Sequence, residues 1–451
     1  MSNSELERLV RLANRVTYGA NRRLLEAVEF FGYEGFVEWQ LDDEALDDSE
    51  LEGLLESILP TLTMSTQALY EHVFEDENFG APQRDLLIAT LVRRTFSPRQ
   101  LFERMVEFWS DHFSVPANDL PVALFKFSED RDLIRKRAMG RFETLLQGDA
   151  KSPAMLYYLD NFSNTAEGPN ENYARELLEL HTMGIDGGYT EQDIKEVARV
   201  FTGWSIRLPG EFAFNDFSHD WSAKQVFGQT IQPTGFEEGV LVLSMLAEQP
   251  STARHIATKL AQRFVTDLPD EQLVDDVTDT FISSSGDTRA TLRRLLLHPL
   301  VSEGMAIKFK RPNEFVSGLA RTLETELTEQ SLLATFQTLS SAGQTPFGWP
   351  APDGYPDNRQ YWQSTNGMVT RFNAAAAWTE QLGAQSAVLR EAAAIEQPIA
   401  QIEFLADTLR PQGMEPASRR RMLRYANRLS AAERPAALAA WLLSGPEAQW
   451  R

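Results

Sequence analysis

The chain has 451 residues, of which 43% are hydrophobic and 24% charged, and this balance excludes a disordered or fibrous protein. Its 43 basic and 65 acidic residues give a formal net charge of -22. Such a surface repels phosphate backbones and anionic headgroups, so we expect no nucleic-acid partner and no membrane-surface role. Cysteine is absent, which excludes disulfides, cysteine-bound metals and thiol nucleophiles.

The first residues predict a helix and no targeting segment. Ser4 is suited to cap a helix whose apolar side contains Leu6 and Leu9, and acidic residues stand where an export signal carries basic ones. No run of about eighteen apolar residues occurs, so no membrane span is predicted. We therefore expect a cytoplasmic protein as the sequence stands, or a periplasmic one if a leader has been removed.

Apolar residues at three- and four-residue spacing predict a mainly α fold. The acidic stretch from Asp42 to Glu56 lacks the glycine and the ligand order of an EF-hand, and it is predicted as a solvated loop and helix start. The predicted helices lie near residues 5–15, 22–40, 64–79, 82–94, 98–113, 129–147, 171–183, 190–203, 252–265, 288–297, 314–323, 367–382 and 401–409.

Residues 204–231 interrupt this pattern with short alternating segments around turns, which predicts a small β-hairpin insert. No linker of low complexity and no repeat of fixed period occurs. Residues 1–451 are therefore predicted to form one large helical domain, with a softer boundary near 233–250 where Pro and Gly interrupt the helices. A second irregular stretch, residues 343–358, is rich in Gly, Pro and aromatic residues, and loops of that length inside a domain are often functional.

Two predicted helices, 171–183 and 190–203, are joined by a short turn and are expected to pack antiparallel. Carboxylates at the rims of their apolar stripes would then approach a common seam; they are Glu176, Asp193 and Glu196. Asp193 also fits a capping box with Thr190, and this local role explains it without any chemistry. Both interpretations stay open from the sequence.

Two histidine positions add to this candidate set. His112 shares one helix face with apolar residues, so it is predicted to be buried and to need a partner, for which a carboxylate of the 171–196 hairpin is the natural candidate. His219 and Asp220 lie in the irregular segment with Lys224 nearby. They fit a metal-ligand pair, an acid/base pair or a turn.

Together these side chains support two hypotheses of different kinds. As a metal-dependent hydrolase, the protein would hold a divalent ion with His112, Glu176, Asp193, Glu196 and His219, and its catalytic groups would be Glu176, Asp193, His219 and Asp220. As a non-catalytic scaffold or binding partner, it would use the same residues as internal ion pairs and caps. The sequence contains no zinc-protease, phosphate-loop, dinucleotide or nucleophile-elbow motif.

Five segments resemble a large bacterial family of uncharacterised proteins, the DUF-eighteen-hundred (DUF1800) family. The resemblance implies a mostly helical fold and no assigned activity, and it implies that a companion protein similar to phosphatases and sulfatases is a partner. The chain departs from the family pattern at Asp111, where Asn is usual, and at His181, where Phe is common. The five segments are Arg15–Gly19, Phe108–Phe113, Ser152–Asn161, Pro169–Gly184 and Tyr189–Trp204.

Overall fold

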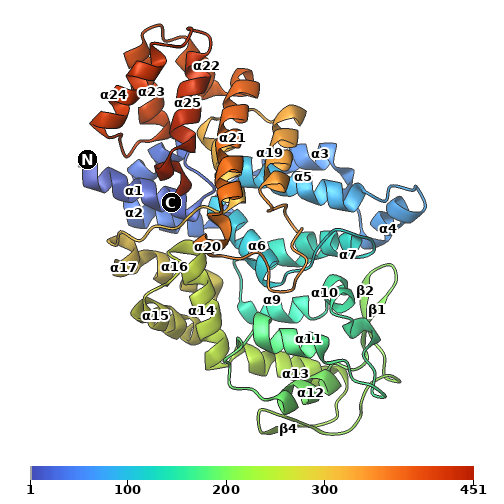
Figure 1. The fold of residues 1–451 in the computed structure, drawn as a ribbon. Coiled ribbons are helices and arrows are strands. Elements are labelled where there is room, and N and C mark those ends of the chain that lie inside the picture. Colours follow the sequence, from blue (N-terminus) through green and yellow to red (C-terminus); the bar gives the residue numbers. More distant parts are fainter. Residues whose placement is uncertain (1–2) are drawn as a thin grey trace.

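The computed structural model describes residues 3–451 and is built almost entirely of helices, which confirms the predicted fold class (Figure 1). The helices before the insert are α1 (Asn3–Val16), α2 (Arg22–Leu41), α3 (Ser49–Ile58), α4 (Thr66–Phe74), α5 (Ala81–Phe96), α6 (Gln100–His112), α7 (Val122–Glu129), α8 (Arg135–Arg137), α9 (Phe142–Asp149), α10 (Pro153–Tyr158), α11 (Glu171–Glu176) and α12 (Glu191–Val200).

The helices after the insert are α13 (Phe236–Ala247), α14 (Pro250–Phe264), α15 (Glu271–Ser283), α16 (Thr288–Leu297), α17 (Pro299–Ser302), α18 (Pro312–Thr322), α19 (Glu329–Ser341), α20 (Arg359–Trp362), α21 (Thr365–Gln381), α22 (Ala387–Ala393), α23 (Pro398–Leu409), α24 (Pro416–Ala426) and α25 (Arg434–Ser444). Single turns are η1 (Asp43–Ala45), η2 (Pro60–Thr63), η3 (Asp130–Ile134), η4 (Asn161–Ser163), η5 (Leu177–His181), η6 (Gly383–Gln385) and η7 (Pro446–Gln449).

The predicted β insert is present and consists of two separate antiparallel hairpins. In the first, β1 (Trp204–Arg207) pairs with β2 (Glu211–Phe214); in the second, β3 (Lys224–Val226) pairs with β4 (Gln229–Ile231). The predicted helix at 129–147 is broken near Gly140, because the backbone there pairs with residues 286–288 instead of continuing the helix. Tertiary pairing of this kind leaves no signal in local periodicity.

Apolar side chains gather in two main clusters. The larger draws on residues between Leu9 and Val301, and the second combines Leu91 of α5 with residues between Phe315 and Leu443. The region near 233–250 does not divide the core, since α13 contributes Val242 to the same cluster as the helices on either side of it. Figure 1 shows α21–α25 at one end of the molecule, the insert at the other end, and α6 between them.

Helix α6 is the most deeply buried element near the centre of the molecule. All of its residues except Asp111 are buried, and these include the charged side chains Glu103, Arg104 and Glu107. A charge removed from water costs several kcal/mol unless it is paired, so α6 requires counter-charges from its neighbours. That requirement determines how α14, α18 and the loop 343–358 are arranged around it.

The loop 343–358 is fixed against the centre of the molecule by backbone contacts. Phe347 accepts a hydrogen bond from the Ala117 amide at 2.8 Å, and Pro350 accepts one from the Tyr158 hydroxyl at 2.8 Å. Gly354 has a φ of +74°, and a Cβ at this residue would lie 2.0 Å from the Asp111 carbonyl oxygen. Only glycine permits this close approach between the loop and α6.

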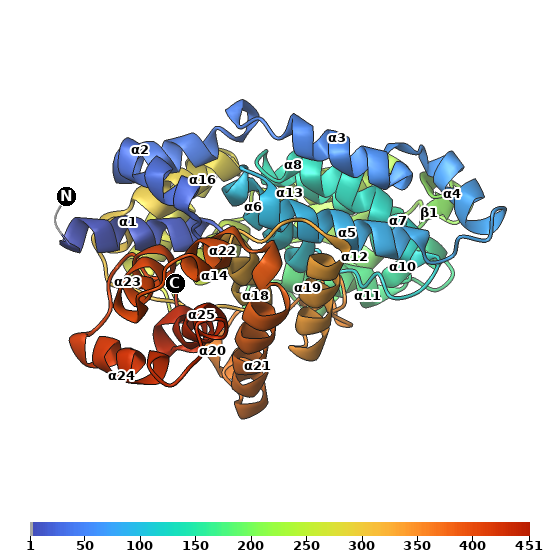
Figure 2. The same ribbon diagram turned by 90° about the horizontal axis from the view of Figure 1, so that it is seen from above.

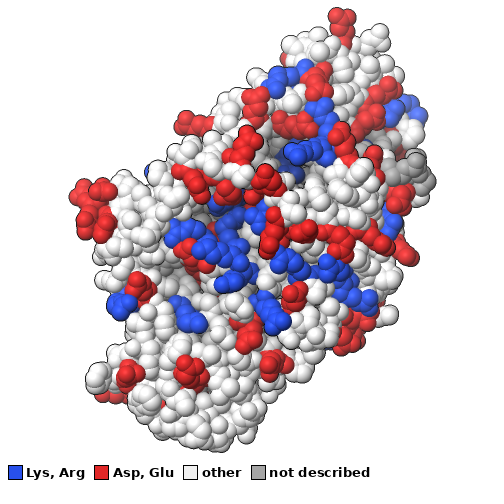
Figure 3. Space-filling model, turned by 180° about the vertical axis from the view of Figure 1, so that it is seen from behind, with Lys and Arg blue, Asp and Glu red and all other residues white. Residues whose placement is uncertain are grey.

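The surface is unevenly charged. On the back face, basic side chains gather across the middle and acidic ones surround them (Figure 3). Seen from above, α2 and α16 lie together on that side (Figure 2), and their facing charges are paired, with Arg293 2.7 Å from Glu38. No helix within residues 3–451 is both long enough and apolar enough to cross a membrane.

Two glycines with nearly the same backbone angle allow a test of the loop contact. We expect Gly343→Ala to destabilise the fold by about 1 kcal/mol, because its φ is +76° but no atom lies within 4 Å of the added Cβ. Gly354→Ala should cost about 1–3 kcal/mol more, because the Cβ also meets the Asp111 carbonyl. Urea unfolding followed by circular dichroism measures both, and equal losses would contradict this account.

Candidate functional site

His112 is buried, as the sequence predicts, but its partners are not the expected carboxylate. Its Nε2 donates to the His181 carbonyl oxygen at 3.0 Å, and its Nδ1 accepts from the Lys259 ammonium at 2.9 Å. Burial and the Lys259 charge lower the pKa of His112, so the ring is neutral. Burial also lowers the pKa of Lys259, to about 8. The prediction of a carboxylate partner was wrong because α14, far along the chain, supplies the lysine.

The three rim carboxylates do not meet. Asp193 forms the predicted capping box with Thr190, and it also accepts the Phe227 amide at 2.8 Å. Glu196 accepts from Arg199 at 2.7 Å and from the Gln225 amide at 2.9 Å, so both carboxylates hold the second hairpin against α12.

Glu176 lies apart from them and makes no hydrogen bond or ion pair with a described residue. Its side chain is only half buried. Burial and the neighbouring charge of Glu179 raise the pKa of Glu176.

His219 belongs to a closed buried cluster within the insert. Its Nδ1 donates to the Thr202 carbonyl oxygen at 2.8 Å, and its Nε2 lies 3.0 Å from a Glu238 carboxylate oxygen. The Lys224 ammonium pairs with the other Glu238 oxygen at 2.6 Å. Glu238 was missed by sequence reasoning because no helix was predicted there; it stands at the third position of α13, where its carboxylate also accepts the Gly235 amide.

Asp220 points to the outside of this cluster. It pairs with Arg199 at 2.7 Å and accepts the Ser222 amide at 2.9 Å. Although partial burial raises the pKa of Asp220, hydrogen bonds from Arg199 and Ser222 outweigh it and hold the pKa well below its usual range. Its carboxylate is thus committed to structural contacts.

The predicted metal ligands therefore lie in separate local networks. His112 sits against α14, Glu176 on α11, Asp193 and Glu196 against the second hairpin, and His219 inside the insert. Among residues 3–451, no group of three or more His, Asp or Glu side chains is arranged to hold a metal ion. The catalytic roles predicted for these residues stay predictions.

A second set of charged residues, which sequence reasoning did not assemble, surrounds α6. Arg311, directly before α18, donates to Asp111 at 2.7 Å and also pairs with Glu107. Arg263 of α14 donates to Asp111 at 2.8 Å and to Asp357 of the loop at 2.5 Å. We call these five residues the α6 charge network.

The arginines of this network keep Glu107 ionised. Burial alone raises the pKa of Glu107, but the guanidinium groups of Arg311, Arg94 and Arg263 outweigh it and lower the pKa to about 2. The Tyr18 hydroxyl donates to the second Glu107 oxygen at 2.5 Å. Tyr18 lies in the segment Arg15–Gly19 and Asp111 in the segment Phe108–Phe113. The contacts around Glu107 thus bring together two of the segments that carry the family resemblance.

Arg94, near the end of α5, is the exception to this pairing. Its side chain is only 5% exposed, yet its guanidinium makes no hydrogen bond or ion pair with a described residue. Its guanidinium carbon lies 5.7 Å from the centre of the Tyr18 ring, and the charges of Glu107 and Asp111 keep the pKa of Arg94 high despite its burial. A buried cation with free donors is costly unless a ligand or water satisfies it.

Arg94 lines a small polar recess between α5, α6, α18 and the loop 343–358. Three further side chains on its wall have unused hydrogen-bonding groups. The Ser110 hydroxyl is buried without a partner, the Ser114 hydroxyl makes no hydrogen bond, and the Gln344 amide uses only its oxygen, which accepts the Asn313 amide at 3.0 Å. The wall also carries the carboxylates of Glu107 and Asp111, both of which already pair with Arg311. Arg94 and these donors are therefore the groups left for an anion.

The recess is small and one wall is aromatic. Its volume is about 20 Å³, which is room for roughly one or two water-sized groups. Trp349 and Tyr355 pack against each other with ring centroids 5.1 Å apart, and the Trp349 indole donates to Asp353 at 2.7 Å. A carboxylate head group fits this space, whereas a sugar or nucleotide does not.

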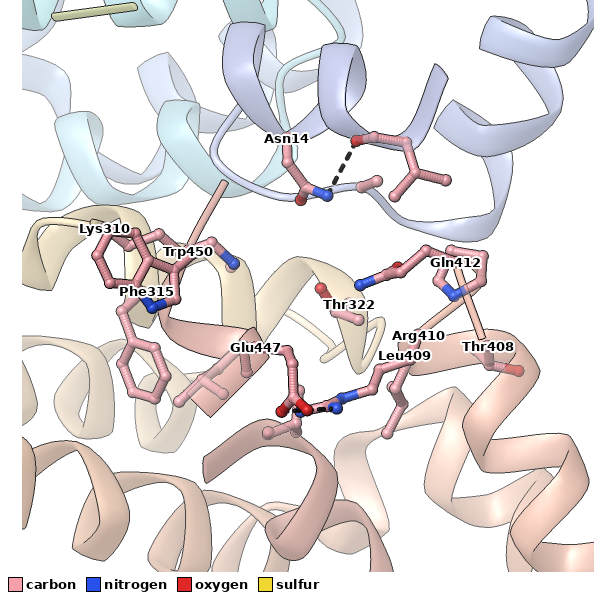
Figure 4. A pocket seen from close by; sticks show the side chains of 17 residues that line it. Asn14, Lys310, Phe315, Thr322, Thr408, Leu409, Arg410, Gln412, Glu447 and Trp450 are labelled. Carbon is pink, nitrogen blue, oxygen red and sulfur yellow. Dashed lines mark hydrogen bonds and ion pairs between the residues drawn. The ribbon is translucent and has the colours of Figure 1, made fainter. Parts of the chain in front are cut away.

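A second polar pocket, of about 60 Å³, lies between α1, α18 and the C-terminal segment (Figure 4). Burial and the charges of nearby arginines lower the pKa of Lys310 on its wall to about 8. Its other cation, Arg410, is already paired with Glu447 at 3.0 Å. This pocket is lined by none of the five segments that carry the resemblance, whereas Ser110 and Asp111 on the wall of the recess belong to one of them, so we place the candidate site at Arg94.

Fold and site together define a mainly helical protein with a buried arginine–carboxylate network around a small polar recess. The family model described as "Protein of unknown function (DUF1800)" matches residues 11–450, so the chain belongs to that family. The resemblance carried by the five segments is thereby confirmed. No curated protein and no solved structure matches the chain significantly.

The departure at His181 provides a stability test. Both ring nitrogens of His181 are buried without a partner, and burial lowers its pKa to about 3. We expect His181→Phe to stabilise the fold by about 1–3 kcal/mol at pH 7.5, because it removes this unsatisfied polar ring.

The stability gap should widen in acid. An unfolded histidine has a pKa near 6.5, so below that pH the unfolded wild-type chain binds a proton that folded His181 does not. Wild-type stability therefore falls by about 1.4 kcal/mol per pH unit more than that of His181→Phe between pH 6.5 and 4. Urea unfolding at pH 7.5, 6 and 5 measures this, with His72→Gln as a control at a partly exposed histidine. Parallel pH profiles for wild type and His181→Phe would refute the assignment.

Proposed function

We propose that this protein is a non-catalytic binding protein whose ligand is a small organic carboxylate held in the recess at Arg94. The single observation that carries the proposal is the unpaired guanidinium of Arg94, buried at the edge of a network whose other arginines have carboxylate partners. A carboxylate would complete that pairing in bidentate geometry. Ser110, Ser114 and Gln344 would supply further contacts to its oxygens.

The metal-dependent hydrolase hypothesis has less support. Its residues other than Glu176 have internal partners that occupy the atoms a metal or a substrate would need. The scaffold hypothesis expects the same residues to form internal ion pairs and helix caps. A phosphatase- or sulfatase-like companion stays a prediction, and co-purification from the native cell would test it separately.

Isothermal titration with acetate tests the proposed ligand class. We expect acetate to bind the wild type. Acetamide, which has nearly the same shape but no charge, and methylammonium, which carries the opposite charge, should not bind. Arg94→Gln should weaken acetate binding about 10- to 100-fold, because a charge-assisted hydrogen bond contributes about 1.5–3 kcal/mol. Arg94→Lys should retain part of the affinity, because it keeps the charge without the fork.

Arg23→Gln, at an exposed arginine of α2, is the matched control and should bind like the wild type. Circular dichroism checks that each variant is folded. Equal acetate affinity in wild type and Arg94→Gln would show that the recess is not the site.

A further inference from the structure

A large apolar groove adjoins the recess. It has a volume of about 1050 Å³ and lies between α3, α5 and α19. Several large apolar side chains on its wall are left open to solvent, with exposures of 45% for Leu54, 49% for Ile58 and 52% for Leu333. An apolar opening of this size on a charged protein is typical of a ligand site.

Groove and recess meet on three separate segments. On α5, Leu91 lines the groove and Arg94 lines the recess. After α6, residues 117–118 line the groove and residues 114–115 the recess. Residues 346–347 line both, so Pro346 and Phe347 form their common wall. The two spaces are therefore neighbours that share Pro346 and Phe347 as lining residues.

Helix α5 links the two spaces along one side. Leu87 and Leu91 follow Arg84 at three- and four-residue spacing, and Arg94 continues the same side of the helix. From Arg84 to Arg94 the helix axis rises about 15 Å. The Arg84 side chain is 64% exposed and marks the outer end, and the unpaired Arg94 marks the inner end.

From this arrangement we infer that the ligand is an unbranched aliphatic carboxylic acid. Its carboxylate would pair with Arg94 in the recess, and its hydrocarbon chain would lie in the groove along α5 against Leu87, Leu91 and Phe336. The inference rests on the carboxylate site proposed above and adds the tail to it. A helix of a partner protein would fill the groove but leave the buried cation at its inner end unpaired.

Titration calorimetry with acetate, hexanoate and decanoate, each below its micelle-forming concentration, tests the inference. Burying a methylene group contributes about 0.8 kcal/mol, so affinity should rise about fourfold per methylene from acetate to decanoate. Decanol, which has the tail without the charge, should bind at least about tenfold more weakly than decanoate.

Two exposed leucines give matched variants that should not disturb folding. Leu333→Glu lies in the groove, and Leu241→Glu lies on α13 at a residue that is 49% exposed and outside the groove. We expect Leu333→Glu to reduce decanoate affinity about tenfold or more and to leave acetate affinity unchanged. Leu241→Glu should change neither.

The outcomes separate this inference from the proposed function. If acetate binds through Arg94 but longer acids bind no tighter, the carboxylate site stands and the groove is not its continuation. If decanol binds as well as decanoate, or Arg94→Gln leaves decanoate affinity unchanged, the groove holds a tail without the head group and the inference is wrong. If neither acetate nor decanoate binds, both proposals fail.

Discussion

The structure depends on the burial of Glu107 in the central helix α6. An ionised carboxylate at this depth is tolerated only because Arg311, with Tyr18 and Asn313, completes its contacts. Asp111, one turn later, extends the pairing to Arg263 and, through it, to Asp357. This pairing thus fixes α14, α18, the loop 343–358 and the segment that follows α1 against each other. Breaking a buried pair of this kind typically costs about 3–5 kcal/mol.

Buried polar side chains that already have partners serve the structure, whereas those without partners are available to a ligand. The His219, Lys224 and Glu238 cluster is closed, because its charges satisfy one another inside the insert. Arg94 has no such partner, although it is buried to a similar degree. The protein as a whole has a formal net charge of -22. An unpaired cation in its interior nevertheless gives the recess a strong local preference for an anion.

Local patterns predicted the fold class, because helical periodicity depends on residues that are neighbours in sequence. They did not predict every helix: α13, α15, α19, α22 and α25 were missed. The helical periodicity, the insert at 204–231, the burial of His112 and the Thr190–Asp193 capping box were all predictable, and the structure contains them. The partners were not predictable. Lys259 is 147 residues from His112, and Arg311 is 204 residues from Glu107, so no spacing rule links them. Only one feature of the sequence points to the Arg94 site: an arginine continues the apolar side of a predicted helix.

The central claim, that Arg94 is free in the protein and pairs with a carboxylate ligand, is tested most directly by the nuclear magnetic resonance signal of its own side chain. The Arg94 Nε–H resonance, assigned by its loss in Arg94→Lys, can be followed during titration with acetate. The account predicts a saturable shift of this resonance, while the resonances of Arg263 and Arg311 move far less because they are already paired. An unmoved Arg94 resonance, or equal shifts of all three, would contradict it.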